Sequence, residues 1–291
     1  MYTLFKSMEN ISQIQLPALL REINDPPKKL YARGILPDEH RHTYITIVGS
    51  RKFTVYGKNV CEKLIGDLAG LPIVIVSGLA FGIDTLAHHY AMKYKIKTLA
   101  VLPSGLRDRD IYPAQNLPLA KNILREGGAL ISEYEPGFRA TNWSFPRRNR
   151  IMAGISRATM IVEAGEKSGT LITAQLALDY NRSVMAVPGP VFSYQSVGCN
   201  QLIRNGAECI TSGSEILDIL SISQNAISAV EKDYNLSEIE KKILDNISVG
   251  KYRDEIANEL KMPIHELSVY LGMLEIKGLI RDNLGMIERG V

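Results

Sequence analysis

Short apolar runs alternate with amphipathic stretches along most of this chain. The runs lie at Tyr44–Val48, Ile73–Ser77, Lys97–Leu102, Ala129–Ser132, Thr159–Glu163 and Ser183–Val187. They lack a regular alternation of apolar and polar positions, which is typical of strands covered on both faces. Helical periodicity fills the intervals, at Lys58–Leu68, Ile83–Lys93, Leu117–Glu126, Arg148–Ile155 and Leu171–Asp179. This order predicts an α/β fold with a doubly wound, mostly parallel sheet, in which ligands bind at the carboxyl ends of the strands.

The two ends of the chain follow other patterns. Residues 1–43 are weakly patterned, with one helix expected around Pro17–Ile23, and are predicted to form a leader ahead of a large domain over 44–220. Residues 221–236 begin with a polar stretch without periodicity, which predicts a linker.

A small domain is predicted over residues 237–291. Ser237, followed three residues later by Glu240, predicts a capping box at the start of its first helix. Its expected elements are helices at Ser237–Asn246, Arg253–Leu260 and Pro263–Lys277, and a two-stranded wing at Arg281–Gly290. Helices and a hairpin in this order predict a winged-helix domain.

Composition excludes several classes of protein. The 291 residues are 45% hydrophobic and 22% charged, which is ordinary for a soluble protein. No apolar run approaches the roughly 20 residues of a membrane span, and the N-terminus lacks a signal pattern. The three cysteines show no CxxC spacing, so neither a disulfide framework nor a zinc site is indicated. We therefore expect a cytoplasmic protein with no membrane contact, no metal and no cofactor.

Positive charge is concentrated between Arg139 and Lys167. This segment holds six basic and two acidic residues, a net charge of +4, whereas the whole chain carries only +3. Trp143 and Phe145 lie just ahead of most of these basic residues. Clustered cations beside aromatic rings favour a phosphate-bearing polymer as ligand.

Two loops at predicted strand ends carry residues suited to phosphate. Gly49, Ser50 and Arg51 follow the first predicted strand, where small residues admit a phosphate to the backbone and a guanidinium can bind it. Gly78 follows the second strand in a glycine-rich turn that ends at Asp84. An ordinary turn with a solvated arginine explains the first loop about equally well, and close helix–strand packing explains much of the second.

A third loop, with Lys167, Ser168, Gly169 and Thr170, precedes a predicted helix, whose free N–H groups favour an anion. It is not a P-loop, because the chain contains no GxxxxGK[ST] sequence. ATP hydrolysis of that type is therefore disfavoured.

Phe145 or Trp143 could stack on a base, and the segment FPRRNR supplies Arg147, Arg148 and Arg150 to follow a phosphate backbone. A solvated helix face is the alternative interpretation. The absence of interleaved acidic residues favours binding, because the arginines then have no local partner.

Catalytic patterns are missing. The sequence contains no GxSxG, no Cys–His arrangement and no carboxylate cluster suited to Mg²⁺. Asp84, Glu133 and Glu163 lie at strand ends or helix starts, where capping explains them. His88 and His89 have no further ligand at metal spacing, so helix positions in the core or on the surface are the favoured interpretation.

The blocks GSRKFTVYG, VSGLAFGIDTLAHHYAM, LAVLPSGLRDRDIYP, ALISEYEPG, FPRRNRIMAGIS, VEAGEKSGTLITAQLA, VMAVPGPV and GCNQLIRNGA resemble the successive motifs of the DNA-processing family DprA, also called Smf. The resemblance runs in order from about Leu16 to Leu220. It implies an extended Rossmann-like domain that binds single-stranded DNA without sequence preference. It also implies protection of incoming strands during natural transformation, loading of the RecA recombinase, work as a homodimer and no catalytic activity.

The resemblance also implies roles for particular residues. Gly49, Ser50, Arg51, Gly78 and the turn Ser168–Thr170 would form a phosphate pocket, to which FPRRNR adds Phe145, Arg147, Arg148 and Arg150. Many members begin with a helical SAM-like domain, for which residues 1–43 are too short. The winged helix that many members append is acidic here, since residues 237–291 hold eight Lys/Arg and ten Asp/Glu, a net charge of −2. That balance favours a protein contact over duplex binding.

Two alternatives remain at this stage. A nucleotide phosphoribohydrolase has a related core, but its motif resembles PGGxGTxxE, and here Thr170 is followed by Leu171, Ile172 and Thr173 with no acid. A transcription factor built around the winged helix is the weaker alternative, because that domain is acidic.

Overall fold

The computed structural model describes residues 10–222, 237–247, 250–276, 279–283 and 285–289. The chain divides into two compact units between Ile222 and Ser223, and each unit is described by itself. None of the helices in the described ranges is both long and apolar enough to cross a membrane.

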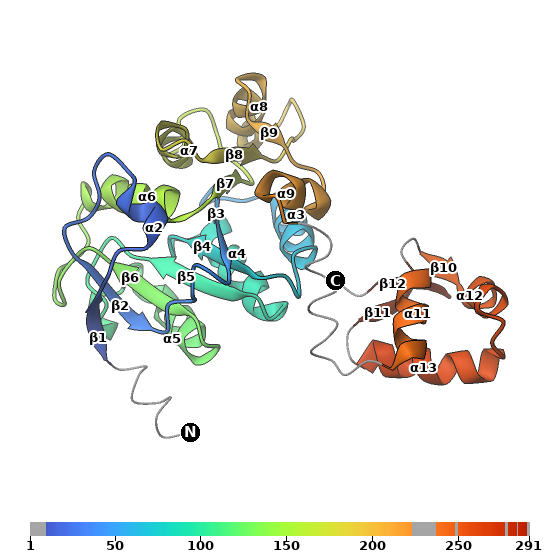
Figure 1. Ribbon diagram of the computed structural model, residues 1–291. Helices are drawn as coiled ribbons and strands as arrows, with labels where there is room; N and C mark the ends of the chain where they lie inside the picture. The colour runs from blue at the N-terminus through green and yellow to red at the C-terminus, as the bar shows by residue number, and fades with distance from the viewer. Residues whose placement is uncertain (1–9, 223–236, 248–249, 277–278, 284, 290–291) are drawn as a thin grey trace. The chain divides into compact units, whose positions relative to one another are not determined.

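A nine-stranded sheet in the order β1-β2-β6-β5-β4-β3-β7-β8-β9 forms the centre of the first unit (Figure 1). Its strands are β1 (Ile11–Ile14), β2 (Leu30–Gly34), β3 (Thr43–Val48), β4 (Ile73–Ser77), β5 (Lys97–Val101), β6 (Ala129–Ser132), β7 (Ala158–Ile161), β8 (Ser183–Ala186) and β9 (Glu208–Cys209). In the sheet order given above, each neighbouring pair of strands from β6 to β9 is parallel. The pairs β1–β2 and β2–β6 are antiparallel. The predicted α/β fold with a mostly parallel sheet is confirmed.

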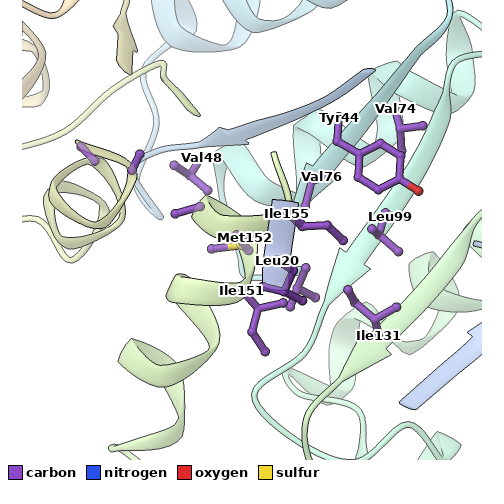
Figure 2. Packing of buried hydrophobic residues seen from close by; sticks show 14 of the residues in the cluster. Leu20, Tyr44, Val48, Val74, Val76, Leu99, Ile131, Ile151, Met152 and Ile155 are labelled. Atoms are coloured by element: carbon purple, nitrogen blue, oxygen red, sulfur yellow. The ribbon is translucent and has the colours of Figure 1, made fainter. Parts of the chain in front are cut away.

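Helices cover both faces of this sheet. On one face lie α2 (Ala18–Arg21), α6 (Ser144–Ile155), α7 (Thr170–Asp179) and α8 (Val197–Arg204). On the other lie α3 (Val55–Gly66), α4 (Ile83–Lys93), α5 (Leu117–Arg125) and α9 (Gly213–Leu220). Figure 2 shows Val74 and Val76 of β4 in the core that α6 and α2 share with the sheet. Ile73 and Ile75 of the same strand face α3 and α4 instead, which explains why the strand is apolar throughout.

The sequence patterns located the central strands but missed the margins of the sheet. β1 and β2 lie within residues 1–43, so the sheet begins earlier than the predicted boundary at residue 44. Helices α8 and α9 and strand β9 were not predicted. Helix α6 begins at Ser144, four residues before the predicted start at Arg148. Pro146 lies in its first turn, where the missing N–H costs nothing.

The second unit holds three helices and a three-stranded sheet in the order β10-β12-β11, among its described residues. Its elements are α11 (Glu238–Asn246), β10 (Lys251–Tyr252), α12 (Arg253–Leu260), α13 (Ile264–Ile276), β11 (Ile280–Asn283) and β12 (Met286–Arg289). The predicted capping box of Ser237 and Glu240 is confirmed. The predicted hairpin is formed by β11 and β12. Most of the predicted linker, residues 223–236, lies outside the described residues.

Candidate nucleic-acid interface

A pocket of 450 Å³ opens where β3 and β7 end. These strands are neighbours in the sheet, and the chain order reverses between them, because β4 lies on one side of β3 and β7 on the other (Figure 1). Ligands of doubly wound sheets bind at such switch points. We call this the strand-end pocket. It is lined by residues 49–52 after β3, by Gly165 and 167–170 after β7, by Tyr194 and Gln195, and by residues of α4, α6 and α7.

The Gly49–Arg51 loop is held from two sides. The N–H of Ser50 donates to the carbonyl of Glu163 at 2.7 Å, and the carbonyl of Ser50 accepts from the N–H of Ile83 at 3.1 Å. Gly82 has a φ of +86°, and a Cβ there would lie 2.2 Å from the Ser50 carbonyl oxygen. The glycine-rich turn after β4 therefore supports the loop after β3 by close backbone approach.

The Lys167–Thr170 turn lies beside the Gly49–Arg51 loop in the wall of the pocket. The Thr170 hydroxyl donates to the carbonyl of Gly49 at 3.2 Å, which ties the two loops together. The N–H of Thr170 donates to the Ser168 hydroxyl at 3.2 Å. Within the described ranges, the N–H groups of Lys167 and Gly169 have no acceptor. Such groups at the start of a helix suit an anion.

Three cations at this pocket lack an acidic partner. Arg51, Lys52 and Lys167 are exposed, and in the described part of the chain no carboxylate lies within 4.0 Å of any of them. The Cζ of Arg51 lies 5.9 Å from the centre of the Phe145 ring, which also lines the pocket. The predicted phosphate-binding loops and Phe145 therefore meet at one site.

Arg148 lies beneath the pocket rather than on its rim. Its side chain is 5% exposed, and its Nη1 donates to the Val101 carbonyl at 3.4 Å and lies 4.0 Å from the Asp84 carboxylate. Burial lowers the pKa of Arg148 to about 10, so the guanidinium is charged at neutral pH. Burial also raises the pKa of Asp84, and Arg148 opposes that shift.

The structure gives Gly78 a different role from the one expected. A Cβ at this position would lie 1.4 Å from Nη1 of Arg148. Gly78 is therefore required to admit the Arg148 guanidinium at the end of β4. Its N–H donates to Asp84 at 3.1 Å instead of pointing to a ligand.

Arg147 and Arg150 do not line the strand-end pocket. Nη2 of Arg150 lies 2.5 Å from Oε2 of Glu133, and the Arg150 side chain is only 6% exposed. Nε of Arg147 lies 4.0 Å from Oε1 of the same glutamate. Because successive residues of an α-helix point about 100° apart, residues 147 and 150 share a side that Arg148 does not. A continuous track of all three arginines is thus not formed.

The carboxylates near the site are already engaged. Glu163 is 2% exposed and accepts hydrogen bonds from the N–H and the hydroxyl of Thr54, at 2.9 and 2.5 Å. Asp84 accepts from Gly78. The described residues contain no group of three His, Cys, Asp or Glu that could hold a metal ion.

Several lining residues were missed at the sequence level, among them Lys52, Tyr194 and Gln195. Lys52 follows Arg51 directly, so its position one residue further along the same loop could have indicated it. Tyr194 and Gln195 come from the connection after β8, which the fold brings to the pocket through the hydrogen bond from Ala164 N–H to the Gln195 carbonyl, at 2.8 Å. No sequence pattern indicated that approach.

Comparison with known proteins shows the family of this chain. Residues 8–221 match the model of the family described as DNA recombination-mediator protein A. The chain belongs to this family. It is 41% identical over 210 residues to the DNA processing protein DprA of Bacillus subtilis, covering 72% of this chain and 70% of that one. It is 34% identical over 275 residues to protein Smf of Escherichia coli, covering 91% and 72%.

Two solved structures of this family resemble the first unit. DNA processing protein A of Streptococcus pneumoniae is 37% identical with a TM-score of 0.67, covering 75% of this chain and 77% of that one. DNA processing protein A of Helicobacter pylori, described for its unique single-stranded DNA binding mode, is 31% identical with a TM-score of 0.65, covering 74% and 97%.

Proposed function

We propose that the strand-end pocket binds the phosphate backbone of single-stranded DNA without sequence preference. The observation that carries this proposal is that Arg51 and Lys167 meet unpaired N–H groups at one pocket, and that neither cation has an acidic partner among the described residues. Cations and amide donors together suit a phosphate. The single-stranded DNA binding described for the Helicobacter pylori relative supports the same ligand class.

Each residue has a distinct part in this proposal. Arg51 and Lys167 contact a phosphate from two neighbouring loops, and the Gly49–Ser50 and Ser168–Thr170 backbones allow it to approach closely. The Phe145 ring stacks on a base, which requires that the base be unpaired. Arg148 adds positive charge from beneath and makes no direct contact.

A salt series tests the proposal. Fluorescence anisotropy should show that a single-stranded oligonucleotide binds more tightly than its duplex, and that binding weakens steeply as salt rises. Arg51→Ala should weaken binding to all sequences alike and reduce the slope of log affinity against log salt by about 0.7. An affinity that is insensitive to both salt and Arg51→Ala would contradict phosphate binding here.

We also propose a role without catalysis. The carboxylates nearest the site are engaged in hydrogen bonds, and no acid follows Thr170 where a phosphoribohydrolase requires one. Purified protein incubated with nucleoside monophosphates should release no free base. Measurable base release that Asp84→Asn abolishes would establish the enzyme instead.

The finer cellular role follows from the family. We propose that this protein, as a homodimer in the cytoplasm, protects incoming strands during natural transformation and loads RecA onto them. Added protein should shorten the lag before RecA covers a single strand that already carries single-strand binding protein. An unchanged lag would remove the loading role and leave DNA binding intact. Sedimentation tests the dimer separately.

For the second unit we propose a winged helix that contacts protein rather than duplex DNA. Helix α13 exposes apolar side chains, with Ile264, Val269 and Met273 at 53%, 57% and 50% exposure. Apolar side chains do not bind phosphate, and residues 237–291 carry a net charge of −2 (eight Lys/Arg, ten Asp/Glu). Truncation after residue 222 should therefore leave the single-strand affinity unchanged. A large loss of affinity would assign DNA contacts to this unit.

A further inference from the structure

A second, smaller recess adjoins the strand-end pocket on the far side of Arg51. We call it the side recess, and its walls include Phe81, Tyr112 and Phe145. Arg51 and Phe145 line both hollows, so the two adjoin at these side chains. A strand whose phosphate lies at Arg51 would therefore pass next to these rings.

Two aromatic rings of the side recess are exposed to solvent. Tyr112 is 47% exposed and Phe81 is 45% exposed. Tyr112 packs edge-to-face on Phe145, with ring centres 5.3 Å apart and planes at 66°. Its hydroxyl makes no hydrogen bond within the described ranges. Half-exposed rings gathered beside a cation resemble the stacking surfaces of single-strand binding proteins.

The side recess is also held in place before any ligand arrives. The Asn116 side chain, four residues beyond Tyr112, donates to the Leu79 carbonyl at 2.8 Å and to the Thr85 hydroxyl at 2.9 Å. This ties the segment that carries Tyr112 to the turn that carries Phe81. Rings fixed in this way lose little conformational entropy when they bind.

We propose that the exposed rings around the side recess form a nucleobase subsite, in which a base stacks on Tyr112 with Phe81 beside it and does not enter the recess, whose volume is only 20 Å³. The proposal rests on the function proposed above, because the strand must be held at Arg51. The base concerned is the one adjacent to the phosphate in the strand-end pocket. Stacking is tolerant of base identity, since every base has a π-face, so no sequence preference arises.

The test uses the full chain and two oligonucleotides of equal length, one normal and one with abasic sites in its centre. Both carry the same phosphates, and only the first can stack. Tyr112→Ala should bind the normal strand about tenfold more weakly than wild type, and should bind the abasic strand as wild type does. Tyr112→Phe keeps the ring and should restore binding to the normal strand.

Two controls distinguish this subsite from the phosphate pocket. Arg51→Ala should weaken binding to both strands. Trp143→Ala removes another exposed ring, at 53% exposure, that lines neither hollow and instead packs on Tyr134 and Phe138, so it should change neither affinity. Thermal unfolding of each variant confirms that it is folded.

Several outcomes would overturn the subsite. These are wild-type affinity of Tyr112→Ala for the normal strand, equal weakening on both strands, or a change in oligomeric state, which would make the rings a protein contact. If wild type binds neither strand, the proposed function fails as a whole. If Arg51→Ala weakens both strands while Tyr112→Ala weakens neither, only the subsite fails.

Discussion

Positively charged side chains on the two sides of helix α6 differ in whether they have an acidic partner. On one side, Arg147 and Arg150 face Glu133, and Arg150 forms a buried ion pair with it. The other side faces the strand-end pocket, where Arg51 and Lys167 remain exposed without an acidic partner in the described chain. A cluster of positively charged residues in a sequence therefore does not indicate which of them are accessible to a ligand.

The difference lies in partners that are distant in sequence. Glu133 directly follows β6, and Asp25 lies in the segment after α2. The carboxylates of both residues form ion pairs with Arg150. A buried guanidinium must be paired, because its desolvation is otherwise costly. An exposed, unpaired arginine at a pocket adds little to stability and is available to a phosphate. We expect substitutions on the two sides to separate stability from DNA binding.

The largest effect is expected at Arg150. Arg150→Ala leaves the Glu133 carboxylate, whose side chain is 10% exposed, with only the more distant Arg147, 4.0 Å away. The free energy of unfolding should fall by about 3–5 kcal/mol, measured by chemical denaturation. Arg147→Ala is the matched control, since that side chain is 53% exposed, and it should cost less than about 1 kcal/mol. Equal costs would refute the distinction between the two arginines.

Gly78→Ala should displace the Arg148 side chain of α6 and lower the free energy of unfolding. The new Cβ would lie 1.4 Å from Nη1 of Arg148, so the guanidinium must move. Overpacking of this kind costs about 1–3 kcal/mol of unfolding free energy. Gly169→Ala is the control, because its Cβ would meet nothing within 4 Å, and stability should change by less than about 0.5 kcal/mol. A fully stable Gly78→Ala would show that Arg148 can be accommodated elsewhere.

Substitutions of Arg51 and of Arg147 should have different effects on the affinity for single-stranded DNA. Loss of Arg51 should weaken single-strand affinity about tenfold, or about 1.4 kcal/mol. Loss of Arg147, which does not line the pocket, should leave the affinity within about twofold. Anisotropy titrations at one salt concentration measure both. A tenfold loss at Arg147 would restore the continuous arginine track that the structure does not form.

The smallest expected effect concerns pH. Burial lowers the pKa of His88, one turn along α4 from Asp84, to about 3. A histidine with a depressed pKa stabilises the fold above its unfolded pKa of about 6.5, and this contribution is lost progressively as pH falls toward 3. Between pH 7 and 5.5 the free energy of unfolding should fall by about 1 kcal/mol through His88.

His88→Gln cannot titrate, so it should lose less stability than wild type over the same interval. Denaturation curves of both proteins at pH 7 and 5.5 provide the comparison. Identical losses would mean that His88 has no part in the pH dependence.

Much of the fold could be predicted because it depends on local patterns. The central strands were located by their apolar runs, and the ends of two of these strands carry Arg51 and Lys167. The antiparallel strands β1 and β2 were missed, since short edge strands have weak patterns and depend on pairing with β6. The start of α6 was placed four residues too late, and the observed helix contains Pro146 in its first turn, where a helix tolerates proline.

The sequence by itself determined the alternation of strands and helices, and it placed small residues and cations immediately after strands. Parallel strands bring such loops to one edge, so a phosphate pocket could be predicted. Only the tertiary structure decided that β3 and β7 are neighbours and that Arg150 forms an ion pair with Glu133. It also decided that the Arg148 guanidinium occupies the space beside Gly78. The reason is physical: strand alternation is a local property of the chain, whereas the pairing of a buried charge depends on residues that the fold brings from elsewhere.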